Sequence, residues 1–334
     1  TVLSKQVHEA TVRLCTEADA GKGLLSPRDY AADALITRDA NLPLAVFSAD
    51  CGILLLYDPI HRAVGAIHAG WRGCAAGIPE KTVQAMTAAF GHPGAWELIE
   101  KAVDNCAAGE KTDIRALLDA LGALSEECGV PSQTLRQLPL IASLDAAEAR
   151  YRALGFSVEM FRDSFADLLW KTRECFRRFG VWGSAAAAWD WGFFELRIFG
   201  IGRLQFEPLD YAGKPALNVH IPSSRPLIHA ECLDSYAQAR EFFGLGRFVV
   251  DSWLLHPVCL KLRPDSGIRQ FMADYELQFI TDDPQFLDVW NIFGVAWEGD
   301  AEKLPADTSL RRIWREHLLS GGMPGRGFGL YESF

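Results

Sequence analysis

A strand-like apolar run passes into a glycine-rich turn in the stretch AVGAIHAGWRG, residues 63–73. A second apolar run, residues 44–47, precedes Asp50-Cys51. His68 and Cys51 therefore both lie at or near the end of a buried strand, where a sheet passes into a loop. The segment Lys5-Gln6-Val7-His8 places a further histidine upstream. This part of the sequence predicts a sheet with candidate ligands at its edge.

One cysteine and two histidines are ligands that zinc takes when three protein groups leave a fourth position open. A structural zinc site needs a fourth ligand, and the sequence contains no Cys-x-x-Cys or His-x-x-x-His pair. His8, Cys51 and His68 therefore suit a catalytic metal better than a structural one. A chance grouping is the alternative, because the chain has 8 cysteines and 8 histidines and a cysteine within an apolar run is usually a core residue.

Four segments resemble, in the same order, the laccase-domain family: residues 5–8, 33–37, 49–51 and 68–73. Members of this family, once called multicopper polyphenol oxidases, are described as zinc-dependent purine nucleoside phosphorylases with adenosine deaminase activity. The resemblance implies zinc ligands at His8, Cys51 and His68, catalytic roles for Cys51, His68 and Arg72, and a purine nucleoside and phosphate as substrates. Arg72 would contact an anion, and a salt bridge that holds the loop is the equal alternative.

The resemblance covers residues 1–95. The family's second half, with its IGP motif and its terminal aromatic-Arg-Arg stretch, does not follow Trp96. We therefore expect a truncated laccase-domain-like mixed sheet, with strands near residues 34–37, 44–57 and 64–68. A helical period then predicts a helix from Ile78 to Phe90. The glycine-rich turn between strand and helix would suit phosphate, although such turns often bind nothing.

The composition is that of an ordinary globular protein, with 49% hydrophobic and 23% charged residues. A net charge of −10 argues against binding to a nucleic-acid backbone. No apolar run reaches the roughly eighteen residues of a membrane span, and no signal segment opens the chain. Dispersed cysteines fit a reducing compartment. We expect a cytoplasmic protein of more than one domain, without nucleic-acid or membrane partners; the sequence does not predict its oligomeric state.

The pattern changes after Trp96. Residues 97–180 have the periodicity of a series of helices, including 144–153 and 158–179. Residues 181–334 are typical of a mixed α/β domain. We expect strands at residues 193–199, 204–206, 217–221 and 248–250. We expect helices at residues 231–243 and 268–277. The glycine-rich tail, residues 321–329, is expected to be loose.

A second resemblance covers residues 97–330. The segments at 202–207, 217–222, 251–255 and 304–310 are similar to poorly characterised acyltransferases that pair a helical N-terminal domain with a GNAT-like C-terminal domain. The resemblance implies acyl-CoA as a co-substrate. The usual acetyl-CoA loop, Arg/Gln-x-x-Gly-x-Gly/Ala before a helix, is absent, because Gly200-Ile201-Gly202 runs into a strand. A pyrophosphate site is therefore not indicated.

Glu207, His220 and Ser252 are the candidate acid or base groups of this second part. A histidine near a strand end can be a general base at neutral pH, but a structural role is favoured for each, since no partner spacing supports catalysis. A tryptophan cluster could line a groove, with core packing as the favoured alternative. Its members are Trp182, Trp189 and Trp191.

The sequence thus predicts an α/β (α+β) chain in three parts: a partial laccase-domain-like part (1–95), a helical acyltransferase-like part (97–180) and a GNAT-like part (181–334). The predicted function is that of a zinc-dependent purine nucleoside phosphorylase and adenosine deaminase, a transferase and hydrolase, fused to an acyltransferase-like domain. Two alternatives stay open. One is an acyl-CoA-dependent N-acyltransferase with an inactive N-terminal segment, and the other is a non-catalytic remnant.

Overall fold

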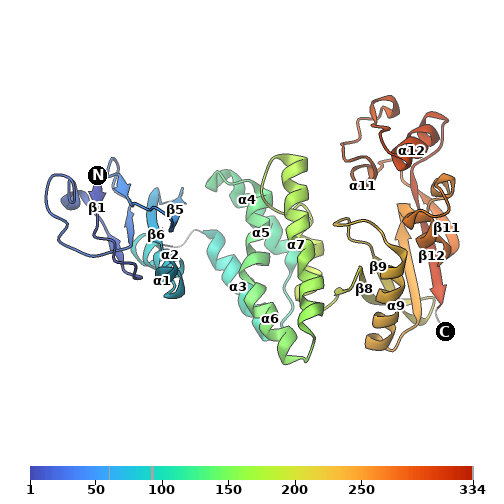
Figure 1. Cartoon of the computed structure of the whole chain (residues 1–334), viewed down its shortest axis with the longest axis horizontal. Helices are drawn as coiled ribbons and strands as arrows, with labels where there is room; N and C mark the ends of the chain where they lie inside the picture. Colours follow the sequence, from blue (N-terminus) through green and yellow to red (C-terminus); the bar gives the residue numbers. More distant parts are fainter. Residues whose placement is uncertain (60, 92–93, 333–334) are drawn as a thin grey trace. The chain divides into compact units, whose positions relative to one another are not determined.

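The computed structural model describes residues 1–59, 61–91 and 94–332 (Figure 1). The chain divides into two compact units. One consists of Thr1–Ala102 with Asp119–Leu135, and the other of Val103–Leu118 with Arg136–Phe334. Each unit contains a sheet, and helices fill the middle of the chain, so the fold is mixed α/β as the sequence predicts. Within the described ranges no helix combines the length and the apolar character that a bilayer span requires.

The first unit contains a four-stranded sheet in the order β2-β3-β6-β5. β3 runs parallel to β2 and antiparallel to β6, and β5 pairs antiparallel with β6. The strands are β2 Val12–Leu14, β3 Ala34–Thr37, β5 Gly52–Asp58 and β6 Ala63–Ala69. A separate parallel pair consists of β1 Val2–Leu3 and β4 Leu44–Ala45. The strands predicted at 34–37 and 64–68 are therefore confirmed.

Helix α2 (Ile78–Phe90) packs on this sheet after the short helix α1 (Trp71–Ala75). Gly77, with φ of 75°, precedes α2, and Gly91 ends it. The buried residues of α2 recur every four positions and form one face: Ile78, Thr82, Met86 and Phe90. This spacing keeps the four side chains on the same side of a helix, where they meet the sheet. The helix predicted over 78–90 is confirmed.

Strand β5 forms an edge of the four-stranded sheet, and its apolar side chains are exposed to solvent. Leu55 is 77% exposed and Tyr57 is 67% exposed. Such an edge presents unpaired backbone groups beside apolar surface.

Five helices occupy the span for which helices are predicted, and a sixth follows it. They are α3 Gly94–Ala108, α4 Ile114–Cys128, α5 Ser132–Ala142, α6 Leu144–Ala153, α7 Val158–Phe179 and α8 Ala187–Phe194. Ser157 caps α7 by accepting a hydrogen bond from the Met160 amide, and Gly180, with φ of 69°, ends it. The predicted bounds of α6 and α7 are confirmed. Sequence reasoning missed α5 and α8.

The second unit has a six-stranded sheet in the order β11-β12-β10-β9-β8-β7. Its strands are β7 Phe199–Ile201, β8 Leu204–Tyr211, β9 Lys214–His220, β10 Arg247–Ser252, β11 Glu276–Asp282 and β12 Gly325–Glu332. Its further helices are α9 His229–Phe243, α10 Gly267–Ala273, α11 Val289–Phe293 and α12 Ser309–Leu319. Short 3-10 turns of this unit are η2 Trp253–Leu255, η3 Pro257–Lys261 and η4 Ala301–Lys303, and η1 Glu17–Asp19 lies in the first unit. The core between sheet and helices includes Phe206, Phe248 and Phe271, each fully buried.

Three secondary-structure predictions for this unit are wrong. The segment 193–199 is not a strand: α8 continues to Phe194, a turn follows, and β7 begins only at Phe199. The helix predicted over 268–277 ends at Ala273, because β11 begins at Glu276. The tail predicted to be loose forms β12, which pairs with β10 and β11. Its glycines are needed because the strand passes close to η2, where a Cβ on Gly327 would lie 2.6 Å from the Leu255 carbonyl oxygen.

The parallel strands β9 and β10 pair over a short distance and then part. Their register covers Leu217 with Phe248 and Asn218 with Val249. Beyond these pairs, β9 continues to His220 and β10 to Ser252 without pairing with each other. A gap between two central strands leaves backbone groups unpaired and opens space at the sheet. This divergence positions the cleft described below.

Candidate functional site

In the first unit, the structure brings His8, Cys51 and His68 together. The possible ligand atoms of the three side chains all lie within 4.8 Å of one another. His68 comes from β6, Cys51 directly precedes β5, and His8 lies in the loop between β1 and β2. His68 is buried, Cys51 is half-buried and His8 is exposed, so the group opens to solvent on one side.

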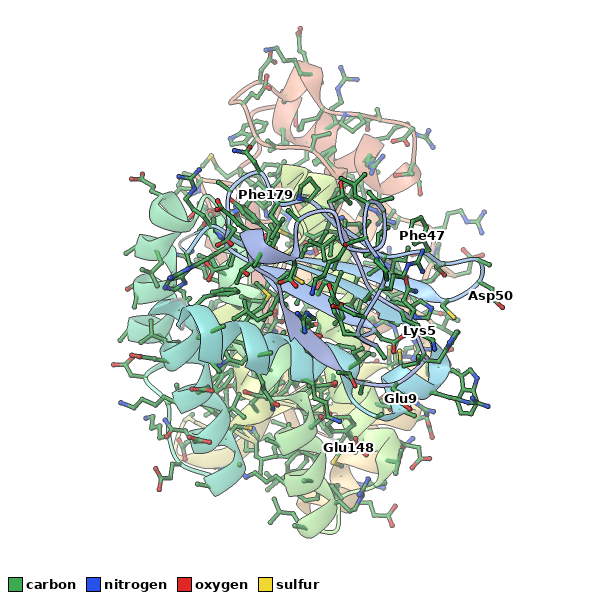
Figure 2. All side chains as sticks on the ribbon, turned by 90° about the vertical axis from the view of Figure 1, so that its left-hand side faces the viewer. Lys5, Glu9, Phe47, Asp50, Glu148 and Phe179 are labelled. Atoms are coloured by element: carbon green, nitrogen blue, oxygen red, sulfur yellow. The ribbon has the colours of Figure 1, made fainter. Side chains whose placement is uncertain are left out.

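Figure 2 shows Lys5, Glu9, Phe47 and Asp50 at the same edge of the first unit. Between these segments Gln6 exchanges two hydrogen bonds with the backbone of Phe47, at 2.7 and 2.8 Å. This exchange joins the loop that carries His8 to the loop that carries Cys51. Two distant segments of sequence therefore form one rim around the three ligands.

Asp33 organises the histidines of this group. Its carboxylate is fully buried and accepts hydrogen bonds from the backbone amides of Val7, His8 and Glu9 at 3.2, 3.0 and 2.9 Å. It also contacts Nδ1 of His68 at 2.9 Å. Burial raises the pKa of Asp33, but these hydrogen bonds outweigh burial, so the net pKa lies below its usual value. The carboxylate thereby holds the His8 backbone at a φ of 61° and leaves Nε2 of His68 for a ligand.

The donors and their surroundings fit a zinc ion. A cysteine sulfur and two imidazole nitrogens are the soft ligands that zinc prefers, and three of them leave a position open. Gly70 closes the space beside them: a Cβ there would lie 3.1 Å from Cδ2 of His8 and 3.2 Å from Sγ of Cys51. The glycine lets the backbone approach the group, which a larger residue would push apart.

Arg72 lies next to this group in sequence, at the start of α1. Its side chain is exposed, and its guanidinium carbon lies 5.3 Å from the centroid of the Trp71 ring. Among the described residues it forms no ion pair. The geometry therefore gives no support to the salt bridge considered from the sequence. The anion contact stays a prediction.

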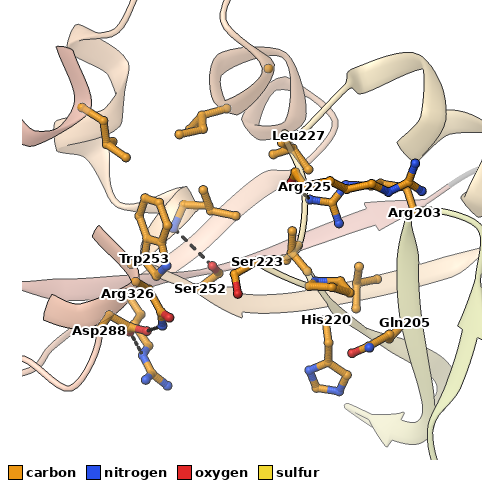
Figure 3. A pocket seen from close by; sticks show the side chains of 18 of the residues that line it. Arg203, Gln205, His220, Ser223, Arg225, Leu227, Ser252, Trp253, Asp288 and Arg326 are labelled. Carbon is orange, nitrogen blue, oxygen red and sulfur yellow. Dashed lines mark hydrogen bonds and ion pairs between the residues drawn. The ribbon is translucent and has the colours of Figure 1, made fainter. Parts of the chain in front are cut away.

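In the second unit, a cleft of about 570 Å³ opens where β9 and β10 diverge (Figure 3). The sheet contributes Gln205 and His220, and η2 contributes Trp253. Asp167 of α7 and Trp189 of α8 form the opposite wall. The cleft thus lies between the sheet and the helices of the same unit.

His220 and Glu207 form a hydrogen-bonded pair across β9 and β8. Nε2 of His220 lies 3.1 Å from Oε2 of Glu207. Arg197 contacts the other oxygen of Glu207. The hydrogen bond from His220 lowers the pKa of Glu207 to about 2, and Arg197 assists against the opposing effect of burial. The Trp189 ring meets the His220 ring edge-on, with centroids 4.3 Å apart.

The tautomer of His220 follows from this pair. An ionised Glu207 can only accept a hydrogen bond, so Nε2 carries the hydrogen and donates it. Nε2 also lies 3.3 Å from Nδ2 of Asn218, whereas no described residue hydrogen-bonds to Nδ1. A histidine in this state is suited to take a proton from a substrate in the cleft.

Ser252 also lines the cleft. Its Oγ accepts a hydrogen bond from the Leu254 amide at 3.2 Å and thereby caps η2. The structure thus gives Ser252 the structural role that the sequence favours, whereas His220 and Glu207 have the partners that sequence spacing could not reveal.

The tryptophan cluster separates in the structure. Trp189 lines the cleft, and Trp191 is buried in the core with only 2% exposure. Trp182 is exposed and stacks on Phe176, with ring centroids 4.3 Å apart. One of the three therefore borders a ligand space.

Arg203 is a cleft residue that sequence reasoning missed. Its side chain is buried, and it donates hydrogen bonds to the carbonyl oxygens of Arg225 and Pro226 at 2.9 and 3.2 Å. Its Nη1 has no hydrogen-bond partner among the described residues, and burial lowers its pKa. A fixed guanidinium with an unused donor is suited to an anion. The signal available was an arginine next to the strand end in GIGRLQF, residues 200–206.

Asp288 and Arg326 line the opposite end of the cleft and were also missed. Nε of Arg326 lies 2.6 Å from Oδ2 of Asp288. Figure 3 shows this pair beside Trp253, at a distance from His220. Asp288 immediately precedes α11 and Arg326 lies on β12, with no shared motif, so the sequence offered no local signal for them.

Comparisons with known proteins match three parts of the chain, of which the first two overlap. Residues 1–106 match the family described as multi-copper polyphenol oxidoreductase laccase. Residues 75–196 match the N-acyltransferase N-terminal domain, and residues 198–331 match the GNAT-like C-terminal domain. Both predicted resemblances are confirmed. The chain combines a laccase-like N-terminal segment with acyltransferase-like domains.

Curated relatives match about a quarter of the chain. A purine nucleoside phosphorylase of Bacteroides thetaiotaomicron is 38% identical over 95 residues, which are 28% of this chain and 35% of that protein. A purine nucleoside phosphorylase of Bacillus subtilis is 37% identical over 91 residues, 26% of this chain and 32% of that protein. The chain therefore spans about a third of the length of these relatives.

Solved structures match the larger part of the chain. An acyltransferase in complex with decanoyl-CoA superposes with a TM-score of 0.59 at 22% sequence identity. The match covers 76% of this chain and 84% of that one. An acyltransferase mutant in complex with octanoyl-CoA superposes equally well, with 23% identity over the same shares. At these identities the likeness establishes the fold.

Proposed function

We propose that the second unit is an acyltransferase that moves an acyl group from a CoA thioester to an amine. The observation that carries the proposal is the His220–Glu207 pair, whose histidine lines a cleft where two parallel strands diverge. Unpaired backbone groups along diverging strands support the binding of an extended, amide-containing donor arm. Structures of the same fold hold decanoyl-CoA and octanoyl-CoA.

The pair supports the following reaction. Nδ1 of His220 removes a proton from the attacking amine, and Glu207 stabilises the imidazolium that forms. The amine nitrogen bonds to the thioester carbon while the carbon–sulfur bond breaks. The thiolate leaves and takes up the proton, which gives an amide and free CoA. Trp189 restricts the His220 ring by its edge-on contact at 4.3 Å, so the base keeps its orientation.

Arg203 would hold an anionic group of the donor. Its backbone hydrogen bonds fix the guanidinium, and its free Nη1 faces no competing carboxylate partner among the described residues. Arg225, which is half-exposed and paired with Glu231 at 3.0 Å, lies in the loop between β9 and α9 whose carbonyl oxygens hold Arg203, and it adds positive charge. A phosphate group of CoA has the charge that this arrangement accepts.

Thiol release tests this proposal. The purified chain is incubated with decanoyl-CoA and a panel of amines, and free CoA is measured. We expect His220→Ala to lower the rate at least about a hundredfold, the usual contribution of a general base. His229→Ala is the matched control, because His229 is also paired with a carboxylate, Asp274 at 2.9 Å, but lies outside the cleft. Equal rates for the wild type and His220→Ala would contradict the role of the base.

A second function is favoured by the convergence of His8, Cys51 and His68. We propose that these residues hold a zinc ion and that the first unit acts on purine nucleosides, by phosphorolysis or by deamination of adenosine. A bound zinc ion would polarise an oxygen atom or lower the pKa of a bound water. Asp33 would orient His68, and Arg72 would attract phosphate from its exposed position on α1.

Metal content tests the second proposal separately from activity. We expect zinc, measured by mass spectrometry, to approach one ion per chain in the wild type and to fall in Cys51→Ala. Cys74→Ala is the matched control, because Cys74 is an exposed cysteine on α1 outside the ligand group. Inosine and phosphate are then assayed for hypoxanthine release. Equal zinc in the wild type and Cys51→Ala would remove the proposed site.

A further inference from the structure

A second cavity, also of about 570 Å³, lies among the helices of the second unit. Helix α7 separates it from the cleft. Leu168 and Thr172 line the cavity, whereas their neighbours Asp167 and Lys171 line the cleft. Consecutive positions on a helix point in different directions, so the two spaces lie on different sides of α7. The cavity is therefore no part of the acyl-transfer site proposed above.

The cavity walls are apolar and come from α5, α6 and α7. Phe161 and Phe165 lie on α7, and Leu144 comes from α6. Ile141 and Leu169 line it while remaining 53% and 55% exposed, so they belong to its open side. A volume of this size, with mostly hydrophobic walls and few polar groups, is typical of a small-molecule site. The exposed guanidinium of Arg162 is its cationic lining group.

One buried carboxyl group in the cavity wall has unused hydrogen-bonding capacity. Asp190 is fully buried, and its Oδ2 accepts a hydrogen bond from Oγ of Ser184 at 2.9 Å. Its Oδ1 has no partner among the described residues. An unsatisfied buried carboxylate oxygen is costly, and a native structure retains one where it has a role.

The charges around Asp190 favour a cation. Burial raises its pKa to about 7, and the negative charge of Asp167 and of Glu174 adds to this effect. The hydrogen bond from Ser184 and the positive charge of Lys171 lower the pKa, but burial outweighs them. Arg162 lines the same cavity, but its residue is exposed to solvent, which screens its charge. Around the buried Asp190, two carboxylates and one ammonium therefore favour a positive ligand over a carboxylate.

We propose that this cavity binds an apolar amine in its ammonium form. Its hydrocarbon part contacts Phe165 and Leu169, and its N–H group donates to Oδ1 of Asp190. A charge-assisted hydrogen bond is stronger than the bond that an alcohol of the same chain length can form. The adjacent residue on α8, Trp189, contacts His220 in the cleft, so occupation of the cavity can also be followed by tryptophan fluorescence.

Calorimetric titration of the full chain with decylamine, decanol and decanoate, below their micelle concentrations, tests the proposal without any acyl donor. We expect decylamine to bind at least about tenfold more tightly than decanol, the difference between a charged and a neutral hydrogen bond. Decanoate is expected to bind most weakly. Asp190→Asn keeps the shape and removes the charge, so it is expected to abolish the preference for the amine and to leave decanol binding unchanged.

Asp163→Asn is the matched control, because Asp163 is a carboxylate on α7 that binds the Gly202 amide and does not line the cavity. It is expected to keep the amine preference. If Asp190→Asn does not fold, Leu169→Trp replaces it: the larger side chain fills the open side and is expected to weaken both ligands. Equal affinity of the wild type for amine and alcohol, or an unchanged preference in Asp190→Asn, would overturn the proposal.

Discussion

Glu207 and His220 face each other from neighbouring strands, and their charges depend on one another. Glu207 is ionised at every pH above about 2, because His220 and Arg197 donate to its two oxygens. The imidazole, which lines the cleft, is thereby held through its Nε2 atom. A single residue change on either strand therefore alters both the stability of the sheet and the base strength available in the cleft.

The lowered pKa of Glu207 makes a prediction about stability. The pKa falls from 4.5 to about 2 on folding, so ionised Glu207 stabilises the folded state above pH 4.5, by up to about 3 kcal/mol. This contribution is lost as the pH falls toward 2. We expect Glu207→Gln to lower the free energy of unfolding at pH 7, and the gap to the wild type to close between pH 4.5 and 2. Urea unfolding at several pH values measures this.

Glu298→Gln is the control for that experiment. Glu298 pairs with Lys303 at 3.1 Å, but both side chains are 65% exposed. Exposed pairs contribute about 1 kcal/mol or less, so this variant should remain close to the wild type. A pH-independent loss in Glu207→Gln would show that packing, and not charge, stabilises the pair.

At the scale of elements, the last strand, β12, has a larger role in the sheet than its glycine-rich sequence indicates. β12 pairs with β10 on one side and β11 on the other, although three of its eight residues are glycines. We expect Gly327→Ala to destabilise the second unit by about 1–3 kcal/mol, because its Cβ would meet the Leu255 carbonyl oxygen at 2.6 Å. Thermal unfolding measures the loss.

Gly94→Ala is the comparison, since no atom lies within 4 Å of a Cβ built at Gly94. This variant should unfold close to the wild type. A Gly327→Ala protein as stable as the wild type would mean that η2 moves away from β12 at little cost.

How far the sequence predicts these elements depends on their side-chain patterns. α6 and α7 were predicted with their bounds because polar and apolar residues alternate with a helical period and clear caps end α7. α5 contains Pro139, which signals a break although the helix continues through it. α8, with the sequence AAWDWGFF, is buried over most of its surface and so lacks a polar face. The glycines of β12 made its sequence look like a loop. The segment is a strand because it pairs with β10 and β11.

The candidate sites follow the same rule. The convergence of His8, Cys51 and His68 could be expected from the sequence, because these residues lie in recognisable segments near strand ends. Their role as metal ligands stays a prediction. The pairing of His220 with Glu207 was not, since it depends on the register of β8 against β9. Arg203, Asp288 and Arg326 meet in one cleft only after the chain folds. The spacing of these residues in the sequence does not predict that they line the same cleft.

At the scale of the whole molecule, the chain carries an exposed apolar edge. β5 has Ile53, Leu54 and Leu55 in succession, at 46, 41 and 77% exposure. An edge strand of this kind is a template for pairing with another chain. We expect the wild type to self-associate as its concentration rises and Leu55→Lys to reduce this association. Sedimentation velocity at several concentrations measures the change.

Leu25→Lys is the control for self-association. Leu25 is 92% exposed but lies in a loop outside the strands, where no backbone ladder is available. It should associate like the wild type. A wild type that remains monomeric at all concentrations would show that β5 is protected. CoA release by Leu55→Lys should equal that of the wild type, because β5 and the cleft belong to different units.

The hydrogen bonds from three consecutive backbone amides to the Asp33 carboxylate should slow the exchange of these amide hydrogens with solvent. Val7, His8 and Glu9 lie in irregular backbone, where amide hydrogens ordinarily exchange with deuterium within seconds. Asp33 accepts a hydrogen bond from each of the three amides. All three hydrogens should therefore be protected from exchange together, and all three should lose this protection together. Deuterium uptake followed by NMR should give these three hydrogens a common slow rate, and Asp33→Ala should return each of them to the rate of a free peptide.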